Sequence, residues 1–368
     1  MTATAAHPVS PSSGPLHGLR VVELAGIGPG PHACMLLADL GAEVIRVERV
    51  VVADGVPTIP DDATLRSRRI VTADLKDSAD LDAVRELIDR ADVLIEGFRP
   101  GVMQRLGLDH TTLRERNPRL IYCSLSGYGA EGPLSQAAGH DGNYLALAGV
   151  LHRNGVPPRC FDPPIADMTS GLFAVIAILG ALECRRRDGL GCHIDLGIAD
   201  VAMPLQLFQL AALDQTVPQP ETTYLNGGAA YYRTYATRDG RHVTLGAVEP
   251  KFWRAFCDAA ERPDWLARQQ EPLPQTGLIR DLAAHFATLS LSECEARFNA
   301  SDCCVSAVLD LAEAVATPHH ATRGVIHRAP LGGWQALFPA LIDAEPPAPR
   351  SPPSQAGVMR WGCESNPE

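Results

Sequence analysis

The sequence predicts an α/β protein whose main sheet is parallel, and two observations carry this prediction. Between Leu19 and Gly129, short apolar runs rich in β-branched residues alternate with segments of helical apolar spacing, which is the pattern of βαβ units. The chain also has 368 residues, of which 46% are hydrophobic and 20% are charged, so it can bury a substantial core. This length suits one large domain or, as the later sequence favours, two domains.

The elements of the first part follow in order. The run LRVVELA from Leu19 predicts a buried strand, and a turn rich in glycine and proline then leads into a helix that ends at Gly41. EVIRVER, Glu43–Arg49, is the next strand. The alternation continues with strands at 68–76, 92–98 and 120–129 and with an amphipathic helix at 78–91.

The second part of the chain has a different character. Helices are expected at 144–150, 170–183 and 199–213, and the middle one is the most apolar segment of the chain. YYRTYATRDGRHVTLGAV is a hairpin pattern whose two extended runs meet at Asp239-Gly240. Helical patterns follow it, so we predict a smaller α+β domain over 218–329. At the other end, a segment rich in Pro, Ser and Ala predicts a disordered tail over 1–18.

Charge and composition argue against several classes of function. Lys plus Arg number 32 against 43 Asp plus Glu, a formal net charge of −11, so we expect no nucleic-acid partner. The longest strongly apolar run, Leu172–Leu182, is shorter than the roughly 20 residues that span a bilayer, so we expect no membrane partner. The cysteines form no C-x-x-C pair, which argues against a metal site. Without a recognisable secretion signal, the expected location is the reducing cytoplasm.

Glycines and arginines follow several of the predicted strands. The Gly26–Pro31 loop lies between a strand and a helix, where backbone N–H groups hold anions, but a tight turn explains it equally well. It is not a dinucleotide fingerprint, because Pro31 stands where the last glycine would be. Arg49 and Arg99 follow strand ends, where open α/β sheets bind ligands, and Arg105 lies near in the sequence. Each alone is better explained as a solvated side chain, but the set indicates a phosphorylated ligand.

Acid/base chemistry has candidates at helix entrances and in one loop. A lone histidine is usually structural or solvated, but His140 is followed at once by Asp141 past a predicted strand end, which favours a tuned acid/base group. Asp167 precedes the most apolar helix, where it is either an N-cap or a carboxylate fixed near an active-site floor. Glu249 also stands at a helix entrance, and its spacing alone indicates a cap. A serine triad is not indicated, because no G-x-S-x-G occurs.

Long, ordered segments of the chain resemble a known family. LRVVELAGIGPGPHACMLLADLGAEVIRVER is similar to the opening of the class III (CaiB/BaiF-type) coenzyme A transferases and their racemase branch. The α-methylacyl-CoA racemase branch in particular is resembled by DVLIEGFRPGVMQRLGLD, LIYCSLSGYGAEGP, AGHDGNYLALAGVLH and GGAAYYRTYATRDGRHVTLGAVEPKFW. The resemblance extends from about Leu16 to Leu341, which is nearly the whole chain.

The resemblance implies a Rossmann-like large domain built from both chain ends, 19–217 and 330–368, with the smaller domain at 218–329 between them. It also implies an interlocked homodimer whose active sites are shared between subunits. Coenzyme A would enter as part of an acyl-CoA substrate, with no prosthetic group and no metal. Besides the Gly-rich turn, the positions that match the coenzyme A contacts of the family are Arg49, Ala73, Gly97, Phe98, Arg99 and Arg105.

The motif around His140 resembles the racemase branch. Racemases of the family usually carry a motif that resembles G-H-D-x-N-Y, and Gly139–Tyr144 reads GHDGNY. Transferases of the family usually carry tyrosine or another non-basic residue in place of the histidine. The resemblance implies that His140 and Asp167 invert the α-carbon of a 2-methylacyl-CoA through an enolate, with Glu249 orienting His140. Asp141 of the same motif is counted with them among the catalytic residues. Backbone N–H groups at the start of the Asp167 helix are expected to bind the enolate oxygen.

The residues after Asp167 resemble the transferases instead. Met168-Thr169-Ser170-Gly171 stands where racemases usually have a glycine triplet. In transferases the matching aspartate is a nucleophile that forms an anhydride with the acyl donor. A coenzyme A transferase acting between carboxylic acids is therefore the second expectation. A CoA-binding homologue with a specialised acyl substrate is the third.

Overall fold

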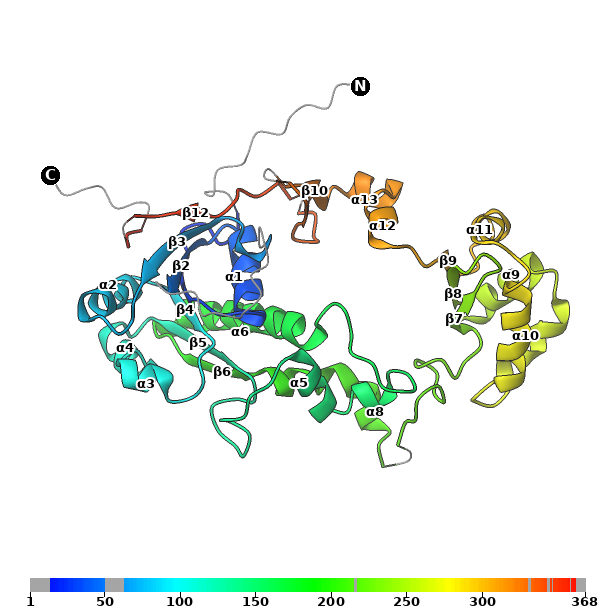
Figure 1. The fold of residues 1–368 in the computed structure, drawn as a ribbon, viewed down its shortest axis with the longest axis horizontal. Helices are drawn as coiled ribbons and strands as arrows, with labels where there is room; N and C mark the ends of the chain where they lie inside the picture. The colour runs from blue at the N-terminus through cyan, green and yellow to red at the C-terminus, as the bar shows by residue number, and fades with distance from the viewer. Residues whose placement is uncertain are drawn as a thin grey trace, which may run out of the picture. The chain divides into compact units, whose positions relative to one another are not determined.

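The structure is a computed structural model that describes residues 14–49, 63–214, 217–329, 332–342, 345, 347–357 and 359–361. Its contacts divide the chain into two compact units (Figure 1). Unit 1 consists of Met1–Ala148, Phe161–Leu205 and Thr317–Glu368, and unit 2 consists of Gly149–Cys160 and Gln206–Ala316. The limits of unit 2 differ from the predicted 218–329, since residues 317–329 belong with unit 1.

The tail predicted over 1–18 is only partly within the described residues. Residues 1–13 lie outside them. The following residues form a turn, and Leu16 donates its backbone N–H to Leu40 O at 2.9 Å. Leu16 also packs against the core of unit 1.

Unit 1 is built on a parallel sheet of seven strands, which confirms the predicted α/β class. The strands pair in the order β12-β3-β2-β1-β4-β5-β6, and the central pair β1 and β2 aligns Val22 with Ile45. Their bounds are β1 Arg20–Leu24, β2 Glu43–Arg49, β3 Arg68–Ala73, β4 Val93–Glu96, β5 Ile121–Ser126, β6 His193–Gly197 and β12 Ser354–Gln355.

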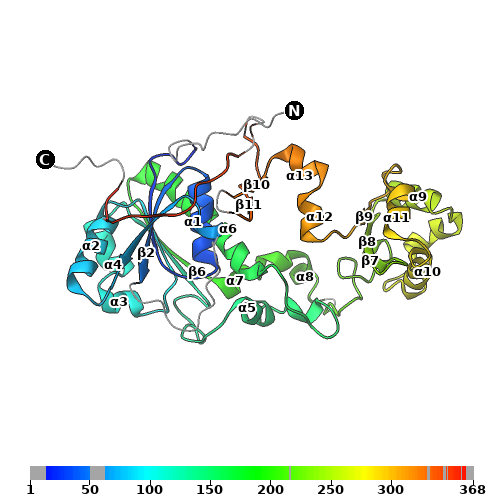
Figure 2. The same ribbon diagram turned by 45° about the horizontal axis from the view of Figure 1, so that its top comes forward.

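Helices cover both faces of this sheet (Figures 1 and 2). Alternate strand residues point to opposite faces, so Val21 packs in the core beneath α1 and α6, while Val22 packs in the core beneath α2 and α4. The helices are α1 Pro29–Asp39, α2 Ser78–Asp89, α3 Val102–Leu106, α4 His110–Arg116, α5 Asp141–Leu147, α6 Ile165–Asp188, α7 Ile198–Val201 and α13 Pro318–Arg323, with a short helix η1 at Ala63–Leu65.

Helix α6 begins earlier than its sequence pattern indicates. The pattern predicts a helix over 170–183, whereas the helix runs over Ile165–Asp188 and ends at Gly189, which adopts a left-handed φ of 78°. By length and composition alone it could cross a membrane, because its most apolar window has a mean hydropathy of 2.0. A core helix meets the same criterion, and Ala174, Val175 and Ile178 of α6 are buried in the core of unit 1.

The C-terminal part of the chain returns to the sheet edge. Strand β12 pairs in parallel with β3 and aligns Ser354 with Arg69. Beyond it, Trp361 is buried in the core beneath α2 and donates its indole N–H to Leu87 O at 3.3 Å. A small antiparallel pair, β10 Ile326–Arg328 and β11 Trp334–Ala336, precedes β12. Both ends of the chain thus contribute to unit 1.

Unit 2 is an α+β unit around a three-stranded antiparallel sheet in the order β7-β8-β9. The predicted hairpin is confirmed, because β7 and β8 pair across a turn in which Gly240 has a φ of 76°. The predicted helix at 199–213 is wrong as a single helix, since Pro204 lacks the N–H that would continue α7. The bounds are η2 Leu151–Arg153, η3 Pro204–Gln206, α8 Leu207–Ala211, β7 Tyr232–Ala236, β8 His242–Gly246, α9 Pro250–Ala259, η4 Pro263–Gln270, α10 Thr276–Phe286, α11 Leu291–Phe298, β9 Val305–Ala307 and α12 Leu311–Val315.

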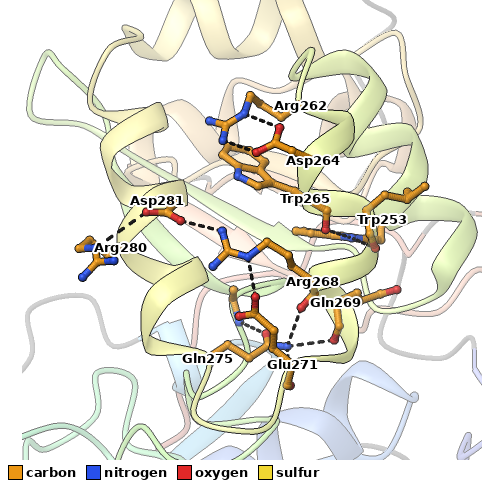
Figure 3. Close-up of polar contacts among 12 residues, drawn as sticks. Trp253, Arg262, Asp264, Trp265, Arg268, Gln269, Glu271, Gln275, Arg280 and Asp281 are labelled. Carbon is orange, nitrogen blue, oxygen red and sulfur yellow. Dashed lines mark hydrogen bonds and ion pairs between the residues drawn. The ribbon is translucent and has the colours of Figure 1, made fainter.

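Polar side chains join the helices of unit 2 around its aromatic core (Figure 3). Arg268 in η4 contacts Glu271 at 2.5 Å and Asp281 of α10 at 2.6 Å. The buried amide of Gln275 donates to the backbone oxygens of Gln269 and Glu271 at 2.9 and 3.0 Å. These contacts fasten η4 to α10, so unit 2 has its own core and its own polar connections.

Candidate active site

A cavity of about 290 Å³ opens at the carboxyl ends of β1, β4 and β5 in unit 1. Ligands of open α/β sheets bind at this edge. The cavity brings together several of the predicted site residues, which are far apart in the sequence. Its lining includes the Gly26–Pro31 loop, Arg49, Gly97, Phe98, His140, Tyr144 and Asp167.

The Gly26–Pro31 loop gives the carboxylate of Asp167 its room. Helix α1 begins at Pro29, where a missing N–H costs nothing, and Gly28 precedes it with a φ of 75°. A Cβ atom on Gly28 would lie 2.8 Å from Asp167 Oδ2, closer than carbon and oxygen can approach. Only a glycine at residue 28 therefore allows the Asp167 carboxylate to approach the loop this closely.

Asp167 is not the N-cap that its sequence position suggested. Helix α6 starts at Ile165 and its N-cap is Pro164, so Asp167 lies within the first turn. The capping carboxylate comes from Asp141, whose Oδ1 accepts the N–H groups of Ala166 at 2.7 Å and Asp167 at 3.1 Å. These N–H groups were expected to bind an enolate oxygen, and the structure corrects that expectation because Asp141 already engages them.

The Asp167 carboxyl has a perturbed protonation equilibrium. Burial raises its pKa from 3.8 to about 6, the nearby Asp141 carboxylate adds to the rise, and His140 opposes it. A carboxyl group with this pKa exists in both protonation states near neutral pH. It is therefore suited to proton transfer in either direction.

His140 lies at the entrance to α5, on the wall of the same cavity. Its backbone N–H donates to Asn143 Oδ1 at 3.0 Å, and the loop before it is fixed by the Tyr144 hydroxyl, which donates to Gly139 O at 2.6 Å. The His140 side chain is exposed in this single chain. The backbone of the loop is thus held by α5, while the imidazole stays accessible.

Tyr144 is a cavity residue to which sequence reasoning assigned no role. Burial, followed by the charge of Asp167, raises the pKa of its hydroxyl to about 12, so the hydroxyl stays protonated as a donor. A Cβ on Gly139 would lie 2.8 Å from the ring of Tyr144 and also 2.8 Å from the Tyr128 hydroxyl. The only sequence signal was the last letter of the GHDGNY motif.

Helices α1 and α6 are joined directly below the cavity. The ring of His32 on α1 hydrogen-bonds Met168 O, next to Asp167, at 3.1 Å through Nδ1. Burial lowers the pKa of His32, which favours a neutral ring that donates this bond. Gly171 leaves room for that ring, because a Cβ there would meet His32 Nδ1 at 2.5 Å. The first turn of α6 is therefore fixed from two sides.

The predicted coenzyme A contacts are only partly brought together. Arg49 and Phe98 line the cavity, and the guanidinium carbon of Arg49 lies 5.8 Å from the centre of the Phe98 ring. Arg99 lines a neighbouring cavity of about 440 Å³, which shares Phe98 with the first. Ala73 is buried at the end of β3 and Arg105 is exposed on α3, and among the described residues neither lines the first cavity.

Glu249 belongs to unit 2 and stands at the N-cap position of α9. Its backbone oxygen accepts N–H bonds from Phe252 and Trp253 at 3.0 Å, but its side chain makes no capping hydrogen bond. Glu249 thus occupies the helix entrance that its spacing indicated but does not cap the helix with its side chain, and the contact with His140 stays a prediction. Among the residues that the structure describes, no group of His, Cys, Asp or Glu side chains is arranged to hold a metal ion.

Comparisons with known proteins agree with the resemblance. The CoA-transferase family III pattern matches residues 16–357. Alpha-methylacyl-CoA racemase from Mus musculus is 38% identical over 84% of this chain and 81% of that protein. Succinyl-CoA:glutarate CoA-transferase from Mus musculus is 32% identical over 68% of this chain and 60% of that protein. The crystal structure of a CAIB/BAIF family protein from Brucella suis superposes with a TM-score of 0.77 at 27% identity, covering 93% of this chain and 96% of that one.

Proposed function

The chain belongs to the CoA-transferase family III, and on this basis we propose that it is a racemase or epimerase of 2-methylacyl-CoA thioesters. The observation that carries the proposal is that His140 and Asp167 line one cavity at the carboxyl ends of parallel strands. The identity of 38% with a mouse α-methylacyl-CoA racemase supports the same choice.

The reaction needs one group on each face of the α-carbon. A neutral His140 removes the α-proton while a protonated Asp167 delivers a proton to the opposite face, and an ionised Asp167 with a protonated His140 performs the reverse inversion. The thioester carbonyl carries the negative charge of the intermediate enolate between the two steps. A pKa of about 6 lets Asp167 serve in both states near neutral pH.

Coenzyme A is part of the substrate in this proposal. Arg49, Gly97 and Phe98 of the cavity wall contact it, and Arg49 supplies positive charge for its phosphates. Ala73, Arg99 and Arg105 extend the coenzyme A site beyond the cavity.

We also propose that two chains form an interlocked homodimer in which Glu249 orients His140. Support comes from large apolar side chains that are exposed in the single chain, including Leu172, Ile176 and Leu179 along one side of α6. Such a stripe of exposed apolar side chains is typical of a surface that contacts another protein.

Exchange of the α-proton tests the racemase proposal. Wild type is incubated with 2-methyldecanoyl-CoA in deuterated water, and mass spectrometry follows deuterium incorporation at the α-carbon. We expect His140→Ala and Asp167→Ala to lower the rate by about 10²–10⁴-fold. Asp82→Asn, a change on the far helix α2, is the control and should match wild type. Failure of wild type to exchange the α-proton of any branched acyl-CoA would overturn the proposal.

A coenzyme A transferase is the second candidate. The transferase-like residues Met168–Gly171 favour it, as does the accessible carboxylate of Asp167 at the cavity wall. In this reaction the carboxylate of Asp167 attacks the thioester carbonyl, forms an acyl anhydride and releases coenzyme A as the thiolate. Hydroxylamine should then convert the acylated Asp167 to a hydroxamate that is found by peptide mass spectrometry. Transfer activity that survives Asp167→Ala would exclude this candidate.

A CoA-binding homologue with a specialised acyl substrate is the third candidate. Binding of coenzyme A by calorimetry, with neither α-proton exchange nor transfer across a panel of acyl-CoA thioesters, would identify it.

A further inference from the structure

Three charged side chains lie buried directly beneath the Gly26–Pro31 loop. Glu23 of β1, Arg46 of β2 and Arg68 of β3 point to the same face of the sheet, the face that α1 covers. The three residues are 1%, 7% and 1% exposed. Glu23 contacts Arg46 Nη1 through Oε1 and Arg68 Nη1 through Oε2, the latter at 3.2 Å. We call this set the Glu23 cluster.

The guanidinium groups of the Glu23 cluster reach the loop at its two ends. Arg46 Nη2 donates to Gly26 O at 3.1 Å, and Arg68 Nη2 donates to Pro31 O. The carbonyl groups at both ends are therefore held from below by side chains that share one carboxylate.

A buried charged cluster is a poor source of stability. Removing several charges from water costs more than their mutual attraction returns in many proteins, and apolar residues of similar volume often fold as well or better. The contacts of the Glu23 cluster instead hold the backbone of the Gly26–Pro31 loop at a fixed distance from the sheet, and this distance is what we call the height of the loop. That height matters, because Asp167 Oδ2 lies within 2.8 Å of the place that a Cβ on Gly28 would take.

We propose that Glu23, Arg46 and Arg68 are positioning residues that set the distance between the Gly26–Pro31 loop and the Asp167 carboxylate. This inference rests on the proposed function, in which that carboxylate reacts with an acyl-CoA. It assigns to Arg46 a role in holding the backbone rather than in binding phosphate.

Helix α1, which covers the Glu23 cluster, offers a matched control at its other end. Asp39, the last residue of α1, pairs with Arg66 through two hydrogen bonds of 3.0 and 2.5 Å, and the two residues are 5% and 3% exposed. This pair has the same chemistry and burial as the Glu23 cluster, but it lies at the end of α1 opposite the loop. Asp39→Asn therefore removes a buried carboxylate without touching the loop.

The test compares Glu23→Gln, Arg46→Lys and Asp39→Asn in the full chain. Amide hydrogen exchange of the peptide 24–33 measures the loop directly, and thermal unfolding measures the fold. We expect Glu23→Gln to raise loop exchange by about tenfold. We expect its kcat for α-proton exchange to fall about 10–100-fold, with KM changed by less than about threefold, because the reacting groups are misplaced while binding remains. Asp39→Asn should lower the Tm by a similar amount without either effect.

Arg46→Lys keeps the charge beside Glu23 but lacks the second arm that reaches Gly26 O, so it should loosen the loop with a smaller loss of Tm. This variant decides the matter if Glu23→Gln does not fold. Loop exchange equal to that of wild type in every folded variant of the Glu23 cluster would overturn the inference. If wild type has no activity on acyl-CoA thioesters, the proposed function fails, whereas loop exchange and the Kd for coenzyme A still decide whether the cluster positions the loop.

Discussion

Asp167 carries its negative charge in an unfavourable place, because burial and the Asp141 carboxylate raise its pKa from 3.8 to about 6. Between these pH values the folded protein holds a proton on Asp167 that the unfolded chain has lost. Stability contributed by this group is therefore greatest below pH 3.8 and falls as the pH rises to about 6.

Replacement by asparagine removes the charge and keeps the size of the side chain. We expect Asp167→Asn to raise the Tm at pH 8, where wild type is ionised, and to have little effect at pH 4, where wild type is protonated. Thermal unfolding of both proteins at pH 8, 6 and 4 measures the difference. A lower Tm for the variant at pH 8 would contradict the argument. Loss of activity together with a gain of stability is the usual relation at a functional site.

Gly28 is a second residue for which we expect a small change to affect catalysis, because it lacks a Cβ atom. Its φ of 75° with a ψ of −120° is a conformation that other residues rarely adopt, which costs them about 1–3 kcal/mol. A Cβ would in addition press on Asp167 Oδ2 from 2.8 Å. We expect Gly28→Ala to lower kcat for α-proton exchange by at least about tenfold, because the carboxylate must move.

Gly26 in the same loop provides the control. A Cβ on Gly26 would meet no heavy atom of the described residues within 4 Å, and the φ of Gly26 is not positive. Gly26→Ala should therefore retain the Tm and lower kcat less than Gly28→Ala does, because its Cβ does not press on Asp167. Deuterium incorporation at the α-carbon measures the activity of wild type, Gly28→Ala and Gly26→Ala, and thermal unfolding measures the stability of each. Equal activity in both alanine variants would contradict the prediction, because it would mean that a Cβ at residue 28 does not displace the Asp167 carboxylate.

At the scale of elements, the start of α6 depends on a carboxylate from another helix. Asp141 caps α6 from the first turn of α5, and it accepts from Ala166 and Asp167. Asp77 caps α2 in the ordinary way and accepts from Ala79 at 2.9 Å and Asp80 at 3.1 Å. Alanine at either cap should lower the free energy of unfolding by about 1 kcal/mol.

Only the cap of α6 is expected to affect catalysis. Asp141→Ala should lower the rate of α-proton exchange and also lower the pKa of Asp167, since one of the charges that raises it is gone. Asp77→Ala should lose stability alone. Urea unfolding and the pH dependence of the rate provide the measurements. A rate profile that keeps its midpoint in Asp141→Ala would refute the electrostatic part.

Elements also show where sequence patterns reach their limit. The predicted β1 and β2 agree with the structure nearly to the residue, because β-branched runs bounded by turns leave few other structures for these segments. The strands predicted at 68–76, 92–98 and 120–129 extend up to three residues past the real ones, and β6 and β12 are not among the predicted strands. The predicted start of α6 is too late, since Pro164 and Ile165 carry no capping signal and the true cap is 25 residues away in the chain. Long-range capping is not visible in a local window.

At the scale of the whole molecule, the apolar stripe of α6 predicts the oligomeric state. Ile176 is 62% exposed in the single chain, and Leu172 and Leu179 lie four residues before it and three after it. If this stripe lies in the proposed homodimer, Ile176→Glu should shift the protein toward monomers. Sedimentation equilibrium over a range of concentrations measures the shift. Arg187→Gln, an exposed polar change on the same helix, is the control, and a monomeric wild type would contradict the proposal.

The candidate site could be predicted from the sequence only in part. His140, Asp167, Arg49 and Phe98 are assigned by matched motifs, and all four line one cavity. Arg46 has the charge of a phosphate-binding residue, yet its side chain is buried with Glu23. Successive residues of a strand point to opposite faces of the sheet, and the charge of a residue does not show which face it is on. Roles that depend on contacts between distant segments, such as that of Asp141, required the fold.

The link between Asp141 and α6 has a consequence for how such enzymes diverge. The contacts that hold this loop use the backbone of residue 140 and the side chain of residue 141. The imidazole of His140 can therefore be exchanged for a non-basic side chain while the carboxylate of Asp167 keeps its support. Exchange of His140 alone would thus remove the proposed proton-transfer group and leave the proposed acyl acceptor, Asp167, on a helix start that Asp141 still holds.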